Sequence, residues 1–177
     1  MNRVNIYLHR MHAMDSSLCV RFNRTSRHRW VRLPFRLVSR LGDGVFWYAV
    51  MIGIVLANPV EGLQPALHMA LAGLTGTFCY KWLKGKTLRP RPYEVHQAIS
   101  VAGAPLDRFS FPSGHTLHAV VFCSIALTYY PMLAWLLLPF TLLVALSRLV
   151  LGLHYPSDVL AGAAIGASIA ALSFLLV

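Results

Sequence analysis

Five apolar runs occupy most of this 177-residue chain and leave few folds open to it. The runs are residues 45–60, 63–80, 116–130, 132–147 and 159–177. They make the chain 56% hydrophobic and only 12% charged, whereas soluble proteins have about 45–50% apolar residues. Too little polar sequence remains to cover five such segments in water, which argues against a soluble bundle of buried helices.

We therefore expect an all-α fold, a polytopic transmembrane helical bundle of about five spans. Several runs are nearer 16 residues than the ~20 of a straight span, so their polar flanks must complete the crossing. Residues 1–44 are rich in arginine and lack the apolar core of a cleavable signal peptide. This pattern divides the chain into a basic N-terminal arm, 1–44, and a membrane-embedded domain, 45–177.

The arm has the pattern of an amphipathic helix lying on a membrane. Basic residues recur at helical spacing, namely Arg29, Arg32, Arg36 and Arg40. Apolar residues form a parallel stripe, namely Trp30, Leu33, Leu37 and Leu41. Such a helix binds anionic lipid, although Pro34 weakens the helical pattern. A solvated basic tail is the alternative. The net charge of +10 does not indicate nucleic acid, because no nucleic-acid-binding module accompanies it.

The first basic cluster follows the second apolar run, at residues 84–92. It contains Lys84 and Arg91 together with prolines at 90 and 92, which remove backbone donors and disfavour helix before them. We expect this segment to leave the helix at the membrane edge and to hold its cations as a cradle for phosphate oxygens. Alternatively, these residues are only the basic flank of a stop-transfer sequence, which has a similar pattern.

The second cluster, Pro112-Ser113-Gly114-His115, precedes the third apolar run. Ser113 is expected to cap that helix, and the amides of Gly114 and His115 belong to its unsatisfied first turn. Those amides and the helix dipole favour an anion, to whose leaving oxygen His115 is placed to donate a proton. A capping turn with a histidine at the lipid headgroups is the alternative.

The third cluster joins the fourth and fifth runs. Arg148 ends the fourth run, and Pro156 is expected in the first turn of the fifth, which brings Asp158 back towards His154. A carboxylate on one imidazole nitrogen fixes the tautomer and leaves the other nitrogen as a nucleophile or base. Alternatively, Arg148 only reaches to the interface and Asp158 only caps a helix.

Five crossings would bring all three clusters to one side of the membrane. The loops after the second and fourth spans then open on the face of the N-terminus, while the opposite turns contain Glu61 and no Lys or Arg. The positive-inside rule assigns the basic face to the cytoplasm, and in a bacterium to the inner membrane. Catalytic lysines and arginines would bias the same count.

These clusters resemble the three-part signature of the type 2 phosphatidic acid phosphatase family. The matching patterns are Lys84-x6-Arg91-Pro92, Pro112-Ser113-Gly114-His115 and Ser147-Arg148-x5-His154-x3-Asp158. The resemblance implies a phosphohistidine mechanism with His154 as nucleophile, Asp158 as its orienting partner and His115 as general acid. It also implies phosphate binding by Lys84, Arg91 and Arg148, with help from Ser113 and Gly114. The family often has six spans, where this chain shows five apolar runs.

The family and the site together imply a metal-independent enzyme without cofactors. The chain has only six acidic residues, whereas divalent-metal phosphatases need clustered carboxylates. Its expected substrate is a membrane lipid phosphate: phosphatidate, phosphatidylglycerol phosphate or a polyprenyl pyrophosphate. A non-catalytic lipid-phosphate carrier is the first rival. The second, a vanadate-using haloperoxidase, is a poor fit to five apolar spans because such enzymes are soluble.

Overall fold

The computed structural model describes residues 3–177, and within that range the regular structure is helical. In chain order the longer helices are α1 (Arg3–Thr25), α2 (Arg29–Arg40), α3 (Phe46–Ala57), α4 (Leu63–Thr87), α6 (Gly114–Tyr129), α7 (Ala134–Val150) and α8 (Pro156–Ser173). The short ones are a π-helical turn η1 (Leu41–Val45), α5 (Pro92–Val95) and a 3-10 turn η2 (Pro131–Leu133). The all-α prediction is confirmed for these residues.

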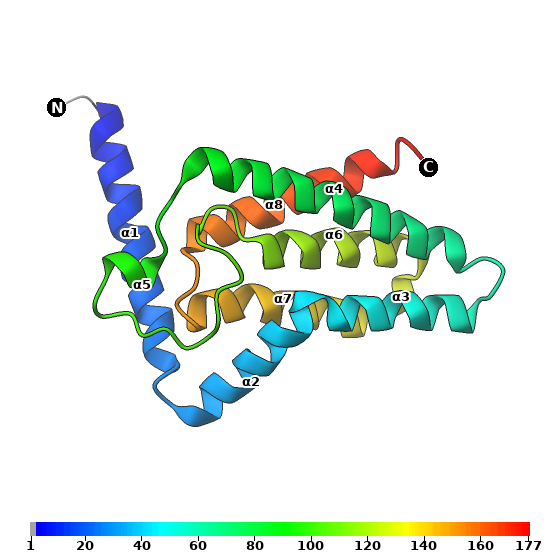
Figure 1. Cartoon of the computed structure of the whole chain (residues 1–177), viewed down its shortest axis with the longest axis horizontal. Helices are drawn as coiled ribbons and strands as arrows, with labels where there is room; N and C mark the ends of the chain where they lie inside the picture. Colours follow the sequence, from blue (N-terminus) through cyan, green and yellow to red (C-terminus); the bar gives the residue numbers. More distant parts are fainter. Residues whose placement is uncertain (1–2) are drawn as a thin grey trace.

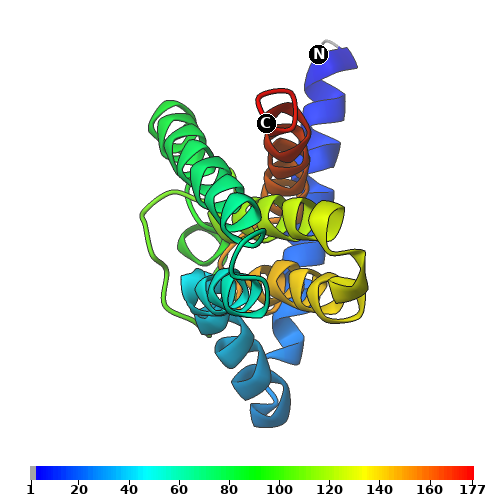
Figure 2. The ribbon, with the colours of Figure 1, turned by 90° about the vertical axis from the view of Figure 1, so that its right-hand side faces the viewer.

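The helices α3, α4, α6, α7 and α8 form a bundle along the long axis of the molecule, seen from the side in Figure 1 and from one end in Figure 2. Helix α6 packs against α4, α7 and α8, which places it at the centre of the bundle. Helix α1, helix α5 and the loop before α6 gather at one end. The loops that carry the predicted clusters lie at this end.

Three described segments are long and apolar enough to cross a membrane: Arg29–Ala57, Pro131–Val150 and Pro156–Ser173. Helices α4 and α6 do not meet the same criteria of length and hydropathy. Large apolar side chains on the outside of the bundle are nevertheless exposed, among them Leu71, Phe78, Trp135 and Leu160. A bilayer would cover such a surface, so the membrane class is supported while the count of five spans stays a prediction.

Glycines bring α6 and α8 into close contact. A Cβ atom added at Gly162 would lie 2.5 Å from the carbonyl oxygen of Ser113, and one added at Gly166 would lie 2.5 Å from that of Leu117. Backbone carbonyls cannot move aside as flexible side chains can. The small-xxx-small pattern of the last apolar run therefore marks a helix–helix contact, as such patterns do in lipid.

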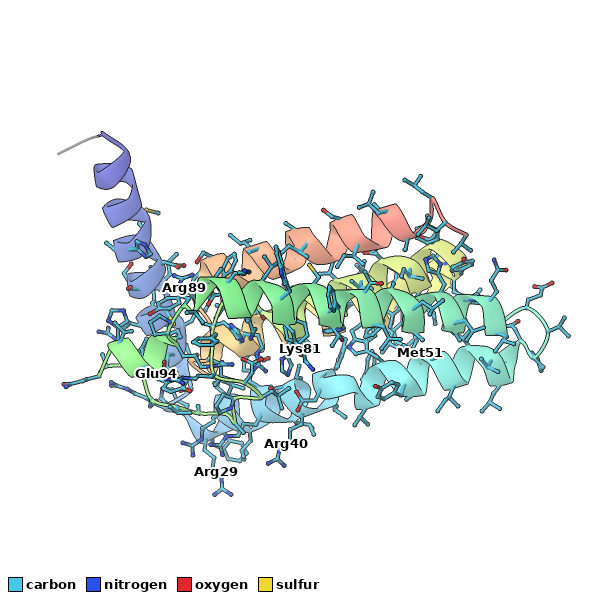
Figure 3. All side chains as sticks on the ribbon, turned by 45° about the horizontal axis from the view of Figure 1, so that its top comes forward. Arg29, Arg40, Met51, Lys81, Arg89 and Glu94 are labelled. Atoms are coloured by element: carbon cyan, nitrogen blue, oxygen red, sulfur yellow. The ribbon has the colours of Figure 1, made fainter. Side chains whose placement is uncertain are left out.

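The chain leaves α4 later than the prolines suggested. Helix α4 continues to Thr87, so that Lys84 lies in its last turn, and Leu88 then adopts a left-handed conformation at φ 48°. Pro90 restricts the residue immediately before it and does not reach back to Lys84. Helix α2 likewise continues through Pro34. Arg29 and Arg40 of this helix extend away from the bundle in Figure 3, whereas Arg36 donates to the Ala102 carbonyl.

Candidate active site

A cavity of about 390 Å³ opens at the end of the bundle where the loops gather. Among the residues that line it are six of the predicted site residues, Lys84, Arg91, Gly114, His115, Arg148 and His154. They come from α4, the segment before α5, the start of α6, the end of α7 and the loop before α8. The fold thus brings together residues from all three sequence clusters.

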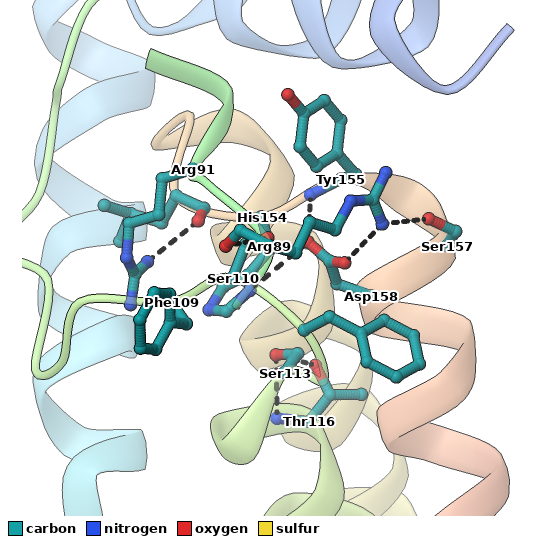
Figure 4. Close-up of polar contacts among 12 residues, drawn as sticks. Arg89, Arg91, Phe109, Ser110, Ser113, Thr116, His154, Tyr155, Ser157 and Asp158 are labelled. Carbon is teal, nitrogen blue, oxygen red and sulfur yellow. Dashed lines mark hydrogen bonds and ion pairs between the residues drawn. The ribbon is translucent and has the colours of Figure 1, made fainter. Parts of the chain in front are cut away.

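Lys84 and Arg91 are both held by Asp107, which lies in the loop before α6. The Asp107 Oδ1 atom is 2.7 Å from Lys84 Nζ and 2.8 Å from Arg91 Nη2. Arg91, labelled in Figure 4, also donates to the Leu153 carbonyl at 2.8 Å. Partial burial raises the pKa of Asp107, but Lys84 and then Arg91 outweigh that effect and hold the pKa below its ordinary value. Asp107 is therefore ionised at neutral pH.

Arg148 has no carboxylate partner within the described residues. Its side chain is 1% exposed, Nη1 donates to Ser39 Oγ at 2.5 Å, and Nε has no hydrogen-bond partner in the described chain. A buried guanidinium without a counter-charge is strongly unfavourable. Because Arg148 also lines the cavity, an anion entering there would supply the missing charge.

His154 lies in the short loop between α7 and α8, where the sequence placed it. Its Nδ1 is 3.6 Å from Asp158 Oδ2, which is adjacent but too far for a hydrogen bond. Asp158 is instead bonded to the Tyr155 amide at 2.8 Å and to Arg89 Nη1 at 2.6 Å (Figure 4). The predicted orienting pair is adjacent in the structure, and its carboxylate has other partners as well.

The environment of His154 favours the neutral imidazole. Burial, followed by the positive charges of the cavity with Arg148 first, holds its pKa well below the ordinary value. A neutral ring keeps the lone pair that a nucleophile needs. His154 is therefore neutral at physiological pH, with one ring nitrogen that carries a free lone pair.

The start of α6 has the predicted cap. Ser113 is the N-cap, its Oγ accepts from the Thr116 amide at 3.4 Å, and the two hydroxyl groups are 2.9 Å apart (Figure 4). The Ser113 side chain is fully buried and does not line the cavity, whereas Gly114 and His115 do. The first turn of α6 thus faces the cavity through its backbone and His115. The hydroxyl group of Ser113 caps the N-terminus of α6 and does not face the cavity.

Arg89 is the main element of the site region that the sequence patterns did not identify. Its guanidinium joins Asp158 on α8 to Asp15 on α1, with both ion pairs at 2.6 Å, and lies 4.1 Å from the centre of the Tyr155 ring. Asp15 in turn accepts from the Ser157 amide at 2.9 Å. Nothing in the local sequence relates residues 15 and 89, because their contact depends on where α1 crosses the bundle.

A bundle of apolar helices whose cavity is lined by Lys84, Arg91, Arg148 and three histidines has the features of a membrane protein that binds an anion at one end of its helices. Residues 62–177 match the model of the PAP2 superfamily, and the chain belongs to that family. This match confirms the family that the three motifs indicated. It also confirms the class of enzyme, a phosphatase that cleaves phosphoric esters or diphosphates.

Individual relatives agree with this assignment. The chain is 42% identical to decaprenylphosphoryl-5-phosphoribose phosphatase of Mycolicibacterium smegmatis over 132 residues, 72% of this chain and 68% of that one. It is 28% identical to the undecaprenyl-diphosphatase BcrC of Bacillus subtilis over 130 residues, 73% and 67% of the two chains. The fold resembles a transmembrane PAP2-type phosphatidylglycerolphosphate phosphatase of Bacillus subtilis, with a TM-score of 0.73 at 24% identity over 94% of this chain and 85% of that one.

Proposed function

We propose that this protein hydrolyses the terminal phosphate of a membrane lipid, a phosphomonoester or a diphosphate, through a phosphohistidine at His154. The observation that carries the proposal is the buried Arg148. It has no carboxylate partner in the described chain and lines the same cavity as His154 and His115. A phosphoryl group bound there would neutralise Arg148 and lie beside both histidines.

In the proposed first step, the imidazole of His154 attacks phosphorus through Nε2, since its Nδ1 faces Asp158. The bond between phosphorus and the lipid oxygen breaks, and His115 gives its proton to that oxygen. In the second step water attacks the phosphohistidine, His115 takes a proton from the water, and the N–P bond breaks to release inorganic phosphate. Each histidine returns to its starting state.

The cations stabilise the charge on the phosphoryl oxygens throughout. Lys84, Arg91 and Arg148 are held in place by backbone carbonyls and by Ser39, so the three cations themselves need to move little when the substrate binds. Phosphoryl transfer asks a protein mainly for this positioning and electrostatic stabilisation. We propose that Gly114 adds its backbone at the start of α6, and that Ser113 contributes by capping that helix.

The shape of the cavity supports a lipid substrate. Beyond the charged end its lining comes from α3, α4 and α6 and includes the apolar side chains of Trp47, Met51, Leu74 and Phe122. A phosphate at the charged end would leave room for the first part of an apolar chain. Phosphatidate, phosphatidylglycerol phosphate and polyprenyl diphosphate all meet this requirement.

The relatives favour a polyprenyl chain, because the names of both curated ones refer to a polyprenyl lipid. We propose a polyprenyl diphosphate or a polyprenyl-linked sugar phosphate as the first substrates to test. No cofactor is proposed. The described residues include no group of three or more His, Cys, Asp or Glu side chains placed to hold a metal ion.

We further propose that all five bundle helices cross the membrane, that residues 1–44 form a basic arm against anionic lipid, and that the active site faces the cytoplasm of an inner membrane. The support is the exposed arginines of α2 and the excess of basic residues at this end. Labelling of a cysteine introduced at Glu61 from outside the cell would agree with this orientation. Labelling from the cytoplasm would contradict it.

Phosphate release by detergent-purified protein in EDTA tests the function. We expect the wild type to release phosphate from at least one lipid phosphate, and His154→Ala to reduce that rate by at least about a thousandfold, since the covalent route is lost. An unchanged rate in His154→Ala would remove the proposed nucleophile, and loss of the wild-type rate in EDTA would indicate a metal. A carrier would bind the lipid and release no phosphate.

A further inference from the structure

Asp43 lies in an unusual turn between α2 and α3. The turn, Leu41–Val45, is π-helical, and Gly44 within it has φ 136°, a conformation that favours glycine. Gly42 lies against α7, where a Cβ atom would be 3.0 Å from Val144. The two glycines that flank Asp43 are therefore suited to the backbone path of this turn. The turn is thus a kink at which one helix ends and the next begins.

The turn brings the Asp43 carboxylate to the proposed general acid. Asp43 Oδ1 and His115 Nε2 are hydrogen bonded, and both residues line the cavity that contains His154 and Arg148. The other ring nitrogen of His115, Nδ1, makes no hydrogen bond to another described residue. Nδ1 is therefore the nitrogen left to meet a substrate.

A purely structural role does not explain this contact. Asp43 lies within Arg29–Ala57, a segment apolar enough to span a membrane, where a carboxylate is costly and commonly functional. Arginines are abundant on the adjoining α2, yet within the described residues Asp43 makes an ion pair only with His115. The carboxylate is thus paired with a histidine of the cavity rather than with a surface cation.

We propose that Asp43 is a positioning residue that orients His115 and stabilises its protonated form for protonation of the leaving oxygen. With Nε2–H donating to Asp43, the proton that moves is the one on Nδ1, and it passes to the lipid oxygen as the P–O bond breaks. A carboxylate in this position acts on histidine as it does in other acid–base sites. The inference rests on the proposed function. It adds a residue that precedes the family match at 62–177.

The test compares two substrates that differ in their need for a proton. An alkyl phosphate has a poor leaving group that requires protonation, whereas p-nitrophenyl phosphate leaves as a stable anion. We expect Asp43→Asn to lower kcat/KM for the alkyl phosphate by at least about tenfold more than for the aryl phosphate. The ratio of the two values does not depend on how much of the enzyme is folded, so a partly unfolded preparation still gives an answer.

Asp107→Asn is the matched control, because Asp107 is a second carboxylate of the same cavity that contacts Lys84 and Arg91 instead of His115. We expect it to change both substrates by the same factor. Asp43→Glu, which keeps the carboxylate, should recover part of the alkyl phosphate rate. In a His115→Ala background, Asp43→Asn should not alter the substrate ratio further.

Equal losses on both substrates would show that Asp43 is merely structural and would overturn the proposal. A higher alkyl phosphate rate in Asp43→Asn would also overturn it, since Asp43 would then be competing with substrate for His115. A wild type that hydrolyses neither substrate, nor any lipid phosphate, would refute the proposed function itself. An active wild type with an unchanged substrate ratio in Asp43→Asn would refute only the role of Asp43.

Discussion

Asp107 places a negative charge where the proposed mechanism needs the oxygens of a phosphoryl group. It binds Lys84 and Arg91 through one oxygen atom, and its side chain is 36% exposed at the mouth of the cavity. A bound phosphate would either displace this carboxylate or share the two cations with it. In both cases Asp107 reduces the positive charge that the substrate meets.

Removal of that charge should strengthen anion binding. We expect Asp107→Asn to lower the inhibition constant of vanadate or inorganic phosphate by about fivefold, or about 1 kcal/mol, because partial exposure screens the effect. Arg91 keeps its bond to the Leu153 carbonyl, so its position should persist. Competitive inhibition measured at one pH and ionic strength provides the check. A higher inhibition constant in Asp107→Asn would show that Asp107 positions the two cations and does not oppose anion binding.

The sequence predicted those features of the site that depend on short separations. Ser113 caps the helix whose first turn contains His115, and Asp158 comes within reach of His154, because the backbone of a helix start fixes both relations. The partners of Asp43 and Asp107 could not be predicted in this way. Their contacts join residues 72 and 23 positions apart, and the paths of the intervening helices and loops decide them.

At the scale of the helices, the contact between α6 and α8 determines where the catalytic groups lie. The carbonyl of Ser113, the N-cap of α6, packs against Gly162 of α8. The Ser113 amide donates a hydrogen bond to the Asp158 carbonyl at 3.0 Å. The second and third sequence clusters are therefore joined directly through backbone atoms. Any change in the separation of these helices would move His115 relative to His154.

Gly162→Ala should separate the two helices. We expect it to destabilise the protein by about 1–3 kcal/mol, the usual cost of overpacking, and to lower the melting temperature by roughly 2–12 °C. Gly53→Ala is the matched control, because a Cβ atom at that exposed position in α3 meets no atom within 4 Å. Thermal unfolding in one detergent compares the variants. An unchanged melting temperature for Gly162→Ala would show that the helix contact is looser than described.

Helix positions followed from the apolar runs, while helix ends did not. The turns after α3 and α6 lie at residues 58–62 and at Tyr130, close to the gaps between the runs 45–60 and 63–80 and between 116–130 and 132–147. Helix α4, in contrast, extends well past the apolar run at 63–80, because Lys81 and Lys84 remain helical at its polar end. The hydropathy of a segment indicates which residues contact lipid. It does not indicate where the helix ends, because a helix can continue beyond the apolar residues.

For the molecule as a whole, the N-terminal segment is part of the active site region. The proposed division at residues 44 and 45 falls inside the turn that carries Asp43, and Ser39 of α2 binds Arg148. Asp15 of α1 meets Arg89 beside the N-terminus of α8. The family match begins only at residue 62, so these contacts are supplied by a part of the chain outside it.

Capture of the phosphorylated enzyme tests the central claim most directly. The wild type would be mixed with a lipid phosphate that it hydrolyses and quenched in alkali within the first turnover, because phosphohistidine is stable in alkali. Mass spectrometry would then locate the phosphorylated residue. We expect phosphate on His154, and none on the His154→Ala variant treated in the same way. Phosphate on any other side chain, or the same phosphopeptide from the variant, would contradict the mechanism.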